Sequence, residues 1–181
     1  MKTFLCILSI LVLSSFKKDN STVREWTRYT LDYADYKARA DKESELDAYT
    51  DCGIKYEMYV EDDSAYIRVV AVLNRHKSWI KYKTPRVLQH EQGHFNICER
   101  SVRLFKKNIL EHAAQLNEKN IDEEMTKMLA QASESNQLNQ NMYERALDDE
   151  RIQNYWDNLI ETDINKLESY SGRIIIIPLK H

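Results

Sequence analysis

The sequence predicts an α+β domain in which the strands come first and the helices follow. Residues 24–83 are rich in tyrosine and β-branched side chains and contain two short apolar patches typical of strands. After Pro85 the apolar residues recur at helical spacing, and no further proline occurs until Pro178. Because strands and helices are segregated along the chain, we expect a small antiparallel sheet packed on the first helix, followed by long helices.

Length and composition limit the class of protein further. The 181 residues suffice for one domain with a sizeable core but not for two ordinary domains. The 3 glycines leave no room for a glycine-rich phosphate loop or a dinucleotide-binding fingerprint. The formal net charge is -3, and no concentrated basic block is present, so we do not expect a nucleic-acid partner.

The first residues predict a secretory signal. Lys2 precedes the apolar run 4–13, which ends in two serines. As a helix this run spans only ~15 Å, about half of a bilayer core, which disfavours a permanent anchor. We therefore expect residues 1–18 to be a signal peptide and residues 22–181 to form a single domain that is secreted or periplasmic and does not span a membrane. A buried N-terminal helix is the competing interpretation.

The two apolar patches of the first half predict a hairpin. Ile54–Val60 and Tyr66–Leu73 have the composition of strands, and the polar residues 61–64 between them supply the turn. The charged stretch 41–47 is expected on the surface.

The second half predicts three helical regions. Residues 86–117 suit one long helix or two, and residues 117–132 continue in the same manner. The Ser, Asn and Gln residues of 133–141 predict a loop. A further helix is expected over 148–169, and 174–177 predicts a short terminal strand or an apolar tail docked on the core.

The motif that points to chemistry is the H-E-x-x-H pattern of residues 90–94. On a helix, His90 and His94 lie on one face, so both imidazoles can reach a single zinc ion at ~2.0–2.1 Å. Glu91 is offset by about 100° and is placed to take a proton from a metal-bound water. Gly93 indicates that a substrate or a strand approaches the helix closely, since glycine within a helix costs ~1 kcal/mol relative to alanine. A chance match of this short motif is the competing interpretation.

A catalytic zinc site usually has three protein ligands, so the motif is incomplete by itself. Each of the other imidazoles is favoured as a surface or core-edge residue: His76, His112 and His181. Carboxylates are abundant in 144–150, where we expect the third ligand. Glu99 falls nearly opposite the histidine face and is expected on the surface.

The cysteines leave three interpretations open. Removal of the predicted signal, which contains Cys6, leaves Cys52 and Cys98. In an oxidising compartment this pair could form one disulfide, and two buried free thiols fit the sequence equally well. Because Cys98 follows His94 by one helical turn, a thiolate ligand is a third and less favoured interpretation.

Taken together, these residues resemble a bacterial family of secreted zinc-dependent proteases, long catalogued as a domain of unknown function. The resemblance covers most of the chain after the predicted signal. It includes Ser78-Trp79-Ile80, where the family has a Ser-Trp-aliphatic element, and the stretch Leu88–Glu99, which matches the family signature nearly residue for residue.

Downstream, the family pattern has a Tyr-Asp pair, a His-Gly pair, and then Gln and Trp. The chain keeps that spacing at four positions: Tyr143, Glu144, Gln153 and Trp156. Asp149 falls where the family has the histidine, so the resemblance implies His90, His94 and Asp149 as the metal ligands, with Asp148 or Glu144 as substitutes. Gln153 and Trp156 are expected to orient the ligand and to pack against the metal helix.

The resemblance implies a zincin-like metallopeptidase that binds Zn²⁺ and hydrolyses a protein or peptide substrate, with Glu91 as general base. Tyr143 has two interpretations, as a donor to the oxyanion or as a core tyrosine with a satisfied hydroxyl group. The general zincin build places an exposed edge strand at 66–73, where an extended peptide could bind. The alternative is a secreted binding or envelope-associated module with a degenerate or structural metal site, and hydrolysis of a non-peptide bond is a third possibility.

Overall fold

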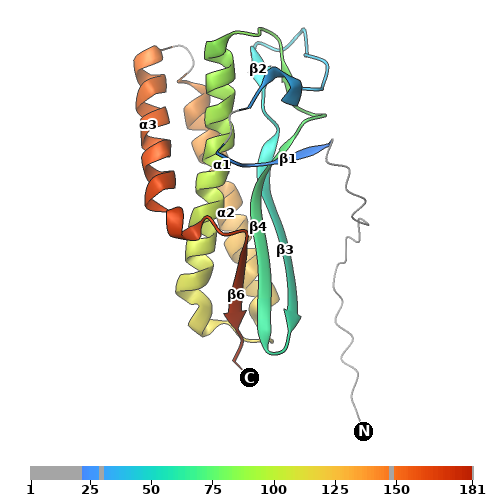
Figure 1. Cartoon of the computed structure of the whole chain (residues 1–181), viewed down its shortest axis with the longest axis vertical. Helices are drawn as coiled ribbons and strands as arrows, with labels where there is room; N and C mark the ends of the chain where they lie inside the picture. Colours follow the sequence, from blue (N-terminus) through green and yellow to red (C-terminus); the bar gives the residue numbers. More distant parts are fainter. Residues whose placement is uncertain (1–21, 29–30, 147–148, 181) are drawn as a thin grey trace.

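The computed structural model describes residues 22–28, 31–146 and 149–180, and these form a mixed α+β structure. A small antiparallel sheet packs against three α-helices within these ranges, which confirms the predicted class (Figure 1). The predicted signal peptide, residues 1–18, lies outside the described residues.

The predicted hairpin is present. Strands β3 (Cys52–Glu61) and β4 (Ser64–Asn74) pair antiparallel along their whole length. The two residues between them, Asp62 and Asp63, have φ angles of 46° and 58°. Two consecutive positive φ angles are typical of the type I′ turn, whose twist matches that of the flanking strands.

Strand β4 is the central strand of the sheet, so the prediction of an exposed edge at 66–73 is wrong. It pairs with β3 on one side, and with β1 (Val23–Glu25) and β6 (Ile174–Pro178) on the other. In the described residues β3 pairs only with β4, which makes β3 an edge strand. A separate two-stranded sheet joins β2 (Ala48–Tyr49) to β5 (Trp79–Ile80).

Helix α1 (Pro85–His112) begins where the proline predicted it. Thr84 caps it by accepting a hydrogen bond from the backbone N–H of Val87 at 3.2 Å, and Pro85 occupies the first turn, where its missing N–H costs nothing. The chain then continues into α2 (Ile121–Glu144) and α3 (Glu150–Lys166).

The predicted loop at 133–141 is wrong, because α2 runs through it. Two of its polar residues face α1 instead of solvent. Asn136 is buried and accepts a hydrogen bond from the hydroxyl of Ser101 at 3.2 Å, and Gln140 contacts His94 of the motif. Polar composition therefore marks a helix–helix contact here and not a break.

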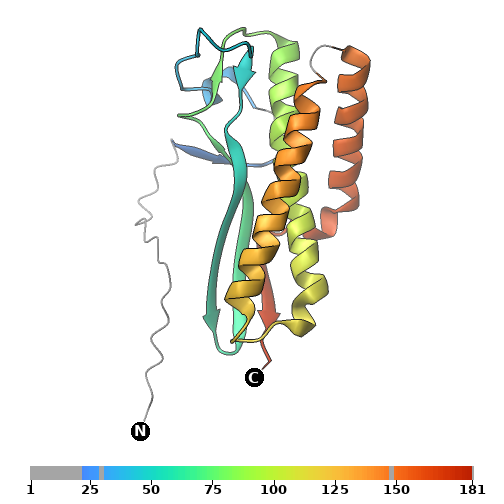
Figure 2. The same cartoon turned by 180° about the vertical axis from the view of Figure 1, so that it is seen from behind.

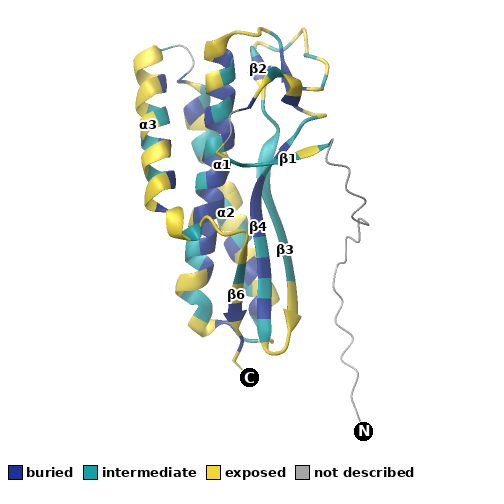
Figure 3. Cartoon of the chain, viewed as in Figure 1, coloured by how far each residue is buried: buried dark blue, intermediate teal, exposed yellow. Residues whose placement is uncertain are grey.

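Helix α1 lies at the centre of the molecule, with the sheet on one side and α3 on the other (Figure 1). Helix α2 packs along α1 on the face seen in Figure 2. The main core lies between α1, α2 and the sheet (Figure 3) and includes Ile67, Leu73, Phe95, Val102, Phe105 and Met125. A second cluster joins the three helices and includes Ile97, Tyr143, Ile160 and Ile164. In the described ranges, no helix combines the length and apolarity needed to cross a bilayer.

Glu99 is not on the surface, contrary to the expectation. Its side chain is buried, and the carboxylate accepts a hydrogen bond from Arg103 at 2.7 Å. Arg103 also donates to the backbone carbonyl of Ile164 at 2.8 Å. A buried carboxylate needs such a partner, and helical periodicity alone cannot show that α3 covers this side of α1.

Candidate metal centre

His90 and His94 project from the buried side of α1 and face one another. Their exposed fractions are only 1% and 7%, and their Nε2 atoms lie 3.1 Å apart. Residues four apart on a helix share a face, so this approach follows directly from the spacing of the motif. The predicted pairing of the two imidazoles is therefore present in the fold.

A glutamine from a different helix holds the Nδ1 atom of each imidazole. The Nδ1 of His90 lies 2.8 Å from Oε1 of Gln153 on α3, and the Nδ1 of His94 contacts Oε1 of Gln140 on α2. Each amide nitrogen has its own acceptor, namely Asp157 at 2.8 Å for Gln153 and the carbonyl of His94 at 3.0 Å for Gln140.

These second acceptors fix the orientation of both amides. The oxygen of each glutamine must face its imidazole, so each Nδ1 carries the proton and donates it. A neutral imidazole protonated on Nδ1 has its lone pair on Nε2. Both Nε2 atoms consequently face the same small space, and a neutral imidazole at each position would offer its lone pair there to a shared cation.

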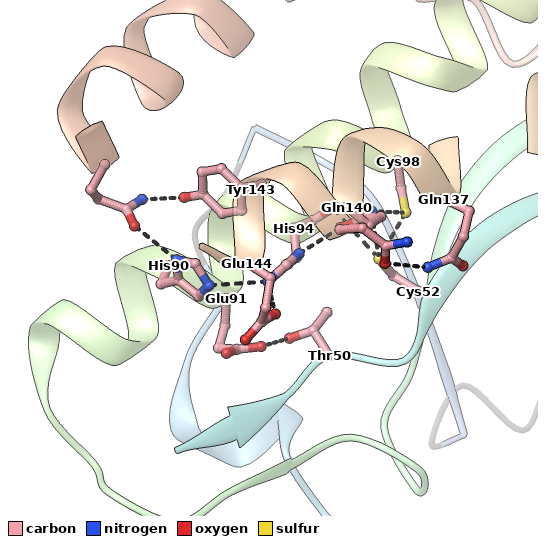
Figure 4. A network of polar contacts seen from close by, with 12 residues as sticks. Thr50, Cys52, His90, Glu91, His94, Cys98, Gln137, Gln140, Tyr143 and Glu144 are labelled. Atoms are coloured by element: carbon pink, nitrogen blue, oxygen red, sulfur yellow. Dashed lines mark hydrogen bonds and ion pairs between the residues drawn. The ribbon is translucent and has the colours of Figure 1, made fainter. Parts of the chain in front are cut away.

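The third donor is Glu144, the last residue of α2. Its Oε2 lies 3.0 Å from Nε2 of His94, and within the described residues the ligand atoms of His90, His94 and Glu144 all lie within 4.8 Å of one another (Figure 4). Ligand atoms around a tetrahedral zinc ion with bonds of ~2.0–2.1 Å are about 3.3 Å apart. The three side chains could hold a metal ion.

The charges of this group are strongly coupled. Burial lowers the pKa of His90, and the neighbouring His94 lowers it further. Burial also opposes protonation of His94, but the hydrogen bond to Glu144 and the charge of Glu91 raise its pKa overall. The same hydrogen bond lowers the pKa of Glu144. A carboxylate that stays ionised beside two imidazoles favours a bound cation.

The structure does not bring Asp149, the predicted third ligand, to the two imidazoles. Asp149 is the N-cap residue of α3, and its carboxylate accepts from the backbone N–H of Arg151 at 2.9 Å and from the Arg151 guanidinium at 3.0 Å. The start of a helix favours a carboxylate in this role. Glu144, the predicted substitute, takes its place in the donor group, and Asp148 lies outside the described residues.

Glu91 is buried next to the donor group, with only 3% of its surface exposed. Oε2 accepts a hydrogen bond from the hydroxyl of Thr50, which lies 3.1 Å from the hydroxyl of Tyr36. Burial raises the pKa of Glu91 to about 7, although His94 and Thr50 lower it. In Figure 4 the carboxylates of Glu91 and Glu144 lie beside each other below the two imidazoles.

Tyr143 is a fully buried tyrosine that supports both imidazoles. Its ring stacks on His90 at a centroid distance of 4.7 Å and meets the ring of His94 edge-on at 5.0 Å. The hydroxyl donates to Asp157 at 2.7 Å and accepts from Gln153. Trp156 packs edge-on against the same ring, which belongs to α2 and not to the metal helix. These contacts favour the core interpretation of Tyr143 over that of an oxyanion donor.

Gly93 is required by Tyr143 and not by a substrate or a strand. A Cβ atom at position 93 would overlap with the hydroxyl oxygen and the ring of Tyr143. The close approach at Gly93 that the sequence predicts is confirmed, but the approaching group is the side chain of Tyr143 on α2.

The other candidates lie elsewhere. His76 is exposed, and His112 contacts the carbonyl of Asn108 near the end of α1. Cys98 contacts Cys52 and Gln140 and does not belong to the donor group among the described residues. His181 lies outside the described residues.

Sequence reasoning missed Thr50, Gln140 and Asp157. Gln140 lies 46 positions from the histidine it contacts, and Thr50 lies 41 positions from Glu91. No local pattern marks such residues, because only the packing of α2 and of the β2–β3 connection onto α1 brings them to the site.

Comparison of the chain with protein-family models, with curated proteins and with solved structures finds no match in any of the three. The resemblance to the secreted protease family therefore stays a prediction that rests on the residues of this chain.

The contact between Gly93 and Tyr143 predicts the effect of Gly93→Ala. Helix propensity alone would stabilise this variant by up to ~1 kcal/mol. Because the Tyr143 ring packs against both imidazoles and Trp156, we expect instead that the free energy of unfolding falls by about 1–3 kcal/mol. Unfolding in denaturant measures this free energy. The control is Gly172→Ala, whose Cβ has room, and a Gly93→Ala variant as stable as that control would contradict the packing described.

Substitution of either glutamine that contacts an imidazole should weaken metal binding although all three ligands remain. Gln153→Leu and Gln140→Leu remove the acceptors for the Nδ1 protons, and each should weaken zinc binding ~10- to 100-fold. Competition with a chromophoric chelator measures the affinity. Gln137→Leu, on an exposed part of the same α2 helix, is the matched control and should bind zinc like the parent. Equal affinity in all the variants would show that the glutamines do not orient the imidazoles.

Proposed function

We propose that the protein is a secreted or periplasmic zinc-dependent peptidase of zincin-like build. The observation that carries this proposal is the group formed by His90, His94 and Glu144, with the buried carboxylate of Glu91 beside it. Two histidines and one glutamate are among the ligand sets of catalytic zinc sites in peptidases, in which a fourth position is kept for water or substrate.

The donor chemistry fits zinc. Imidazole nitrogen and carboxylate oxygen are both ligands of Zn²⁺, and the oriented Nδ1 hydrogen bonds raise the basicity of the imidazoles. When bound, zinc would polarise a peptide carbonyl and lower the pKa of water toward ~7.

Glu91 is the group that we assign to proton transfer. Its Oε2 is held by Thr50, and we assign Oε1 to take the proton of the attacking water and to deliver it to the nitrogen of the leaving amine. A buried carboxylate at this position can accept a proton from the water and then release it to the leaving amine.

Tyr143 supports the site in this proposal without touching the substrate. Its hydroxyl proton is given to Asp157, so it is not available to a developing oxyanion in this arrangement. Its ring packs against both imidazoles and limits their movement, so we assign Tyr143 as a positioning residue.

Strand β3 is the element that would hold an extended peptide. It is the edge strand of the sheet, and it begins two residues after Thr50, which contacts Glu91. A peptide that paired with the free edge at Cys52 and Gly53 would run past the donor group. The edge function predicted for 66–73 is thus proposed for β3 instead.

The alternative, a secreted binding or envelope-associated module, would have either four protein ligands around a structural zinc or no metal. Among the described residues the group contains three donors together with a buried carboxylate. A structural site has no use for a buried carboxylate that lies beside the metal without being a ligand, and this observation favours the peptidase.

The test is Glu91→Gln in the zinc-loaded protein, assayed on a mixed peptide library by mass spectrometry. The amide keeps the shape of the side chain and the contact with Thr50 but cannot accept the proton. We expect cleavage to fall about 100-fold or more, with zinc content unchanged.

The matched control is Glu111→Gln, an exposed glutamate on the same helix, which should cleave like the parent. Full activity of Glu91→Gln would contradict the proposed mechanism. A zinc-loaded parent that cleaves no peptide would overturn the function and favour the binding module.

A further inference from the structure

The sulfur atoms of two cysteines meet where the sheet joins the metal helix. The Sγ of Cys52, the first residue of β3, lies 2.7 Å from the Sγ of Cys98 on α1. Cys98 is fully buried and Cys52 is partly exposed. Both are free thiols in the structure, they are the two cysteines among the described residues, and Figure 4 shows their sulfur atoms next to each other.

The packing of the core, and not a contact between the sulfur atoms, holds strand β3 next to helix α1. Strand β4 and helix α1 share the main core, which contains Ile67, Leu73, Phe95 and Val102, and β3 is paired to β4 along its length. A disulfide forms without strain only where the backbone already brings both side chains together. The packing of this fold meets that condition at Cys52 and Cys98.

We propose that Cys52 and Cys98 form a disulfide that ties the edge strand to the metal-binding helix. In the reaction, a thiolate of the pair attacks a small-molecule disulfide and releases one thiol. The second cysteine then attacks the mixed disulfide and releases the other thiol. The protein loses two electrons and two protons, and the oxidant gains both.

The disulfide would lie next to the residues that position the metal ligand His94. Cys98 follows His94 by one turn, and the amide nitrogen of Gln140 lies 3.2 Å from Cys98 Sγ and 3.7 Å from Cys52 Sγ. The oxygen of the same amide accepts from Nδ1 of His94. The disulfide would therefore contact the amide of Gln140, the residue that orients this imidazole.

The covalent loop encloses the motif itself. It spans 46 positions and contains the β3–β4 hairpin, β5 and the first half of α1, including His90 and His94. A cross-link over a loop of this length restricts the unfolded chain, and its reduction should lower the melting temperature by about 10 °C. This inference is independent of peptidase activity.

The test uses the full chain, refolded in a mixture of reduced and oxidised glutathione, quenched with acid and alkylated in denaturant. Trypsin digestion without reduction should yield residues 43–55 linked to residues 87–100. Free, alkylated thiols at both positions would overturn the proposal, and so would a bond from either cysteine to Cys6.

Melting curves give a second measurement. The oxidised parent and Cys6→Ala should both lose about 10 °C on addition of a reductant, whereas Cys52→Ala/Cys98→Ala should show no dependence on it. If the melting temperature of the oxidised parent does not change when the reductant is added, the proposal is also overturned. The peptide map needs no variant, so it decides the matter even if the double variant does not fold.

Discussion

The candidate site depends on two hydrogen bonds that face away from it. Because Gln153 and Gln140 each accept the Nδ1 proton of one histidine, both Nε2 atoms are turned toward the same point. Without those acceptors either ring could flip or change tautomer, and the spacing of the motif would not suffice. Gln153 belongs to α3 and Gln140 to α2, whereas both histidines belong to α1. The metal centre therefore exists only when all three helices are assembled.

The packing around Tyr143 explains how that assembly is held. Its ring fills the space between the two imidazoles and α3, and its hydroxyl joins Gln153 to Asp157 in one buried network. Gly93 gives the ring room on α1. The network is fully paired, which makes it rigid and specific. Stability and site geometry thus rest on the same contacts.

Features that depend on local spacing could be predicted from the sequence. The pairing of His90 with His94 follows from 3.6 residues per turn, and the two-residue turn between β3 and β4 follows from the polar residues there. The predicted α+β class follows from the order of strand and helix patterns. In each case the information lies within a few neighbouring residues.

Features that depend on tertiary contacts could not be predicted from the sequence. The Ser, Asn and Gln residues of 133–141 resemble a loop, yet Asn136 and Gln140 are polar because they face the polar side of α1. Asp149 has the right chemistry for a ligand but caps a helix instead, and Glu144 reaches the imidazoles only because α2 ends beside them.

The most direct test of the central claim compares two isosteric substitutions. Zinc affinity should fall in Glu144→Gln by more than the roughly 10- to 100-fold typical of residues that only orient a ligand, whereas Asp149→Asn should bind zinc like the parent. A loss confined to Asp149→Asn, or no loss in either variant, would show that the metal is not held by the group described.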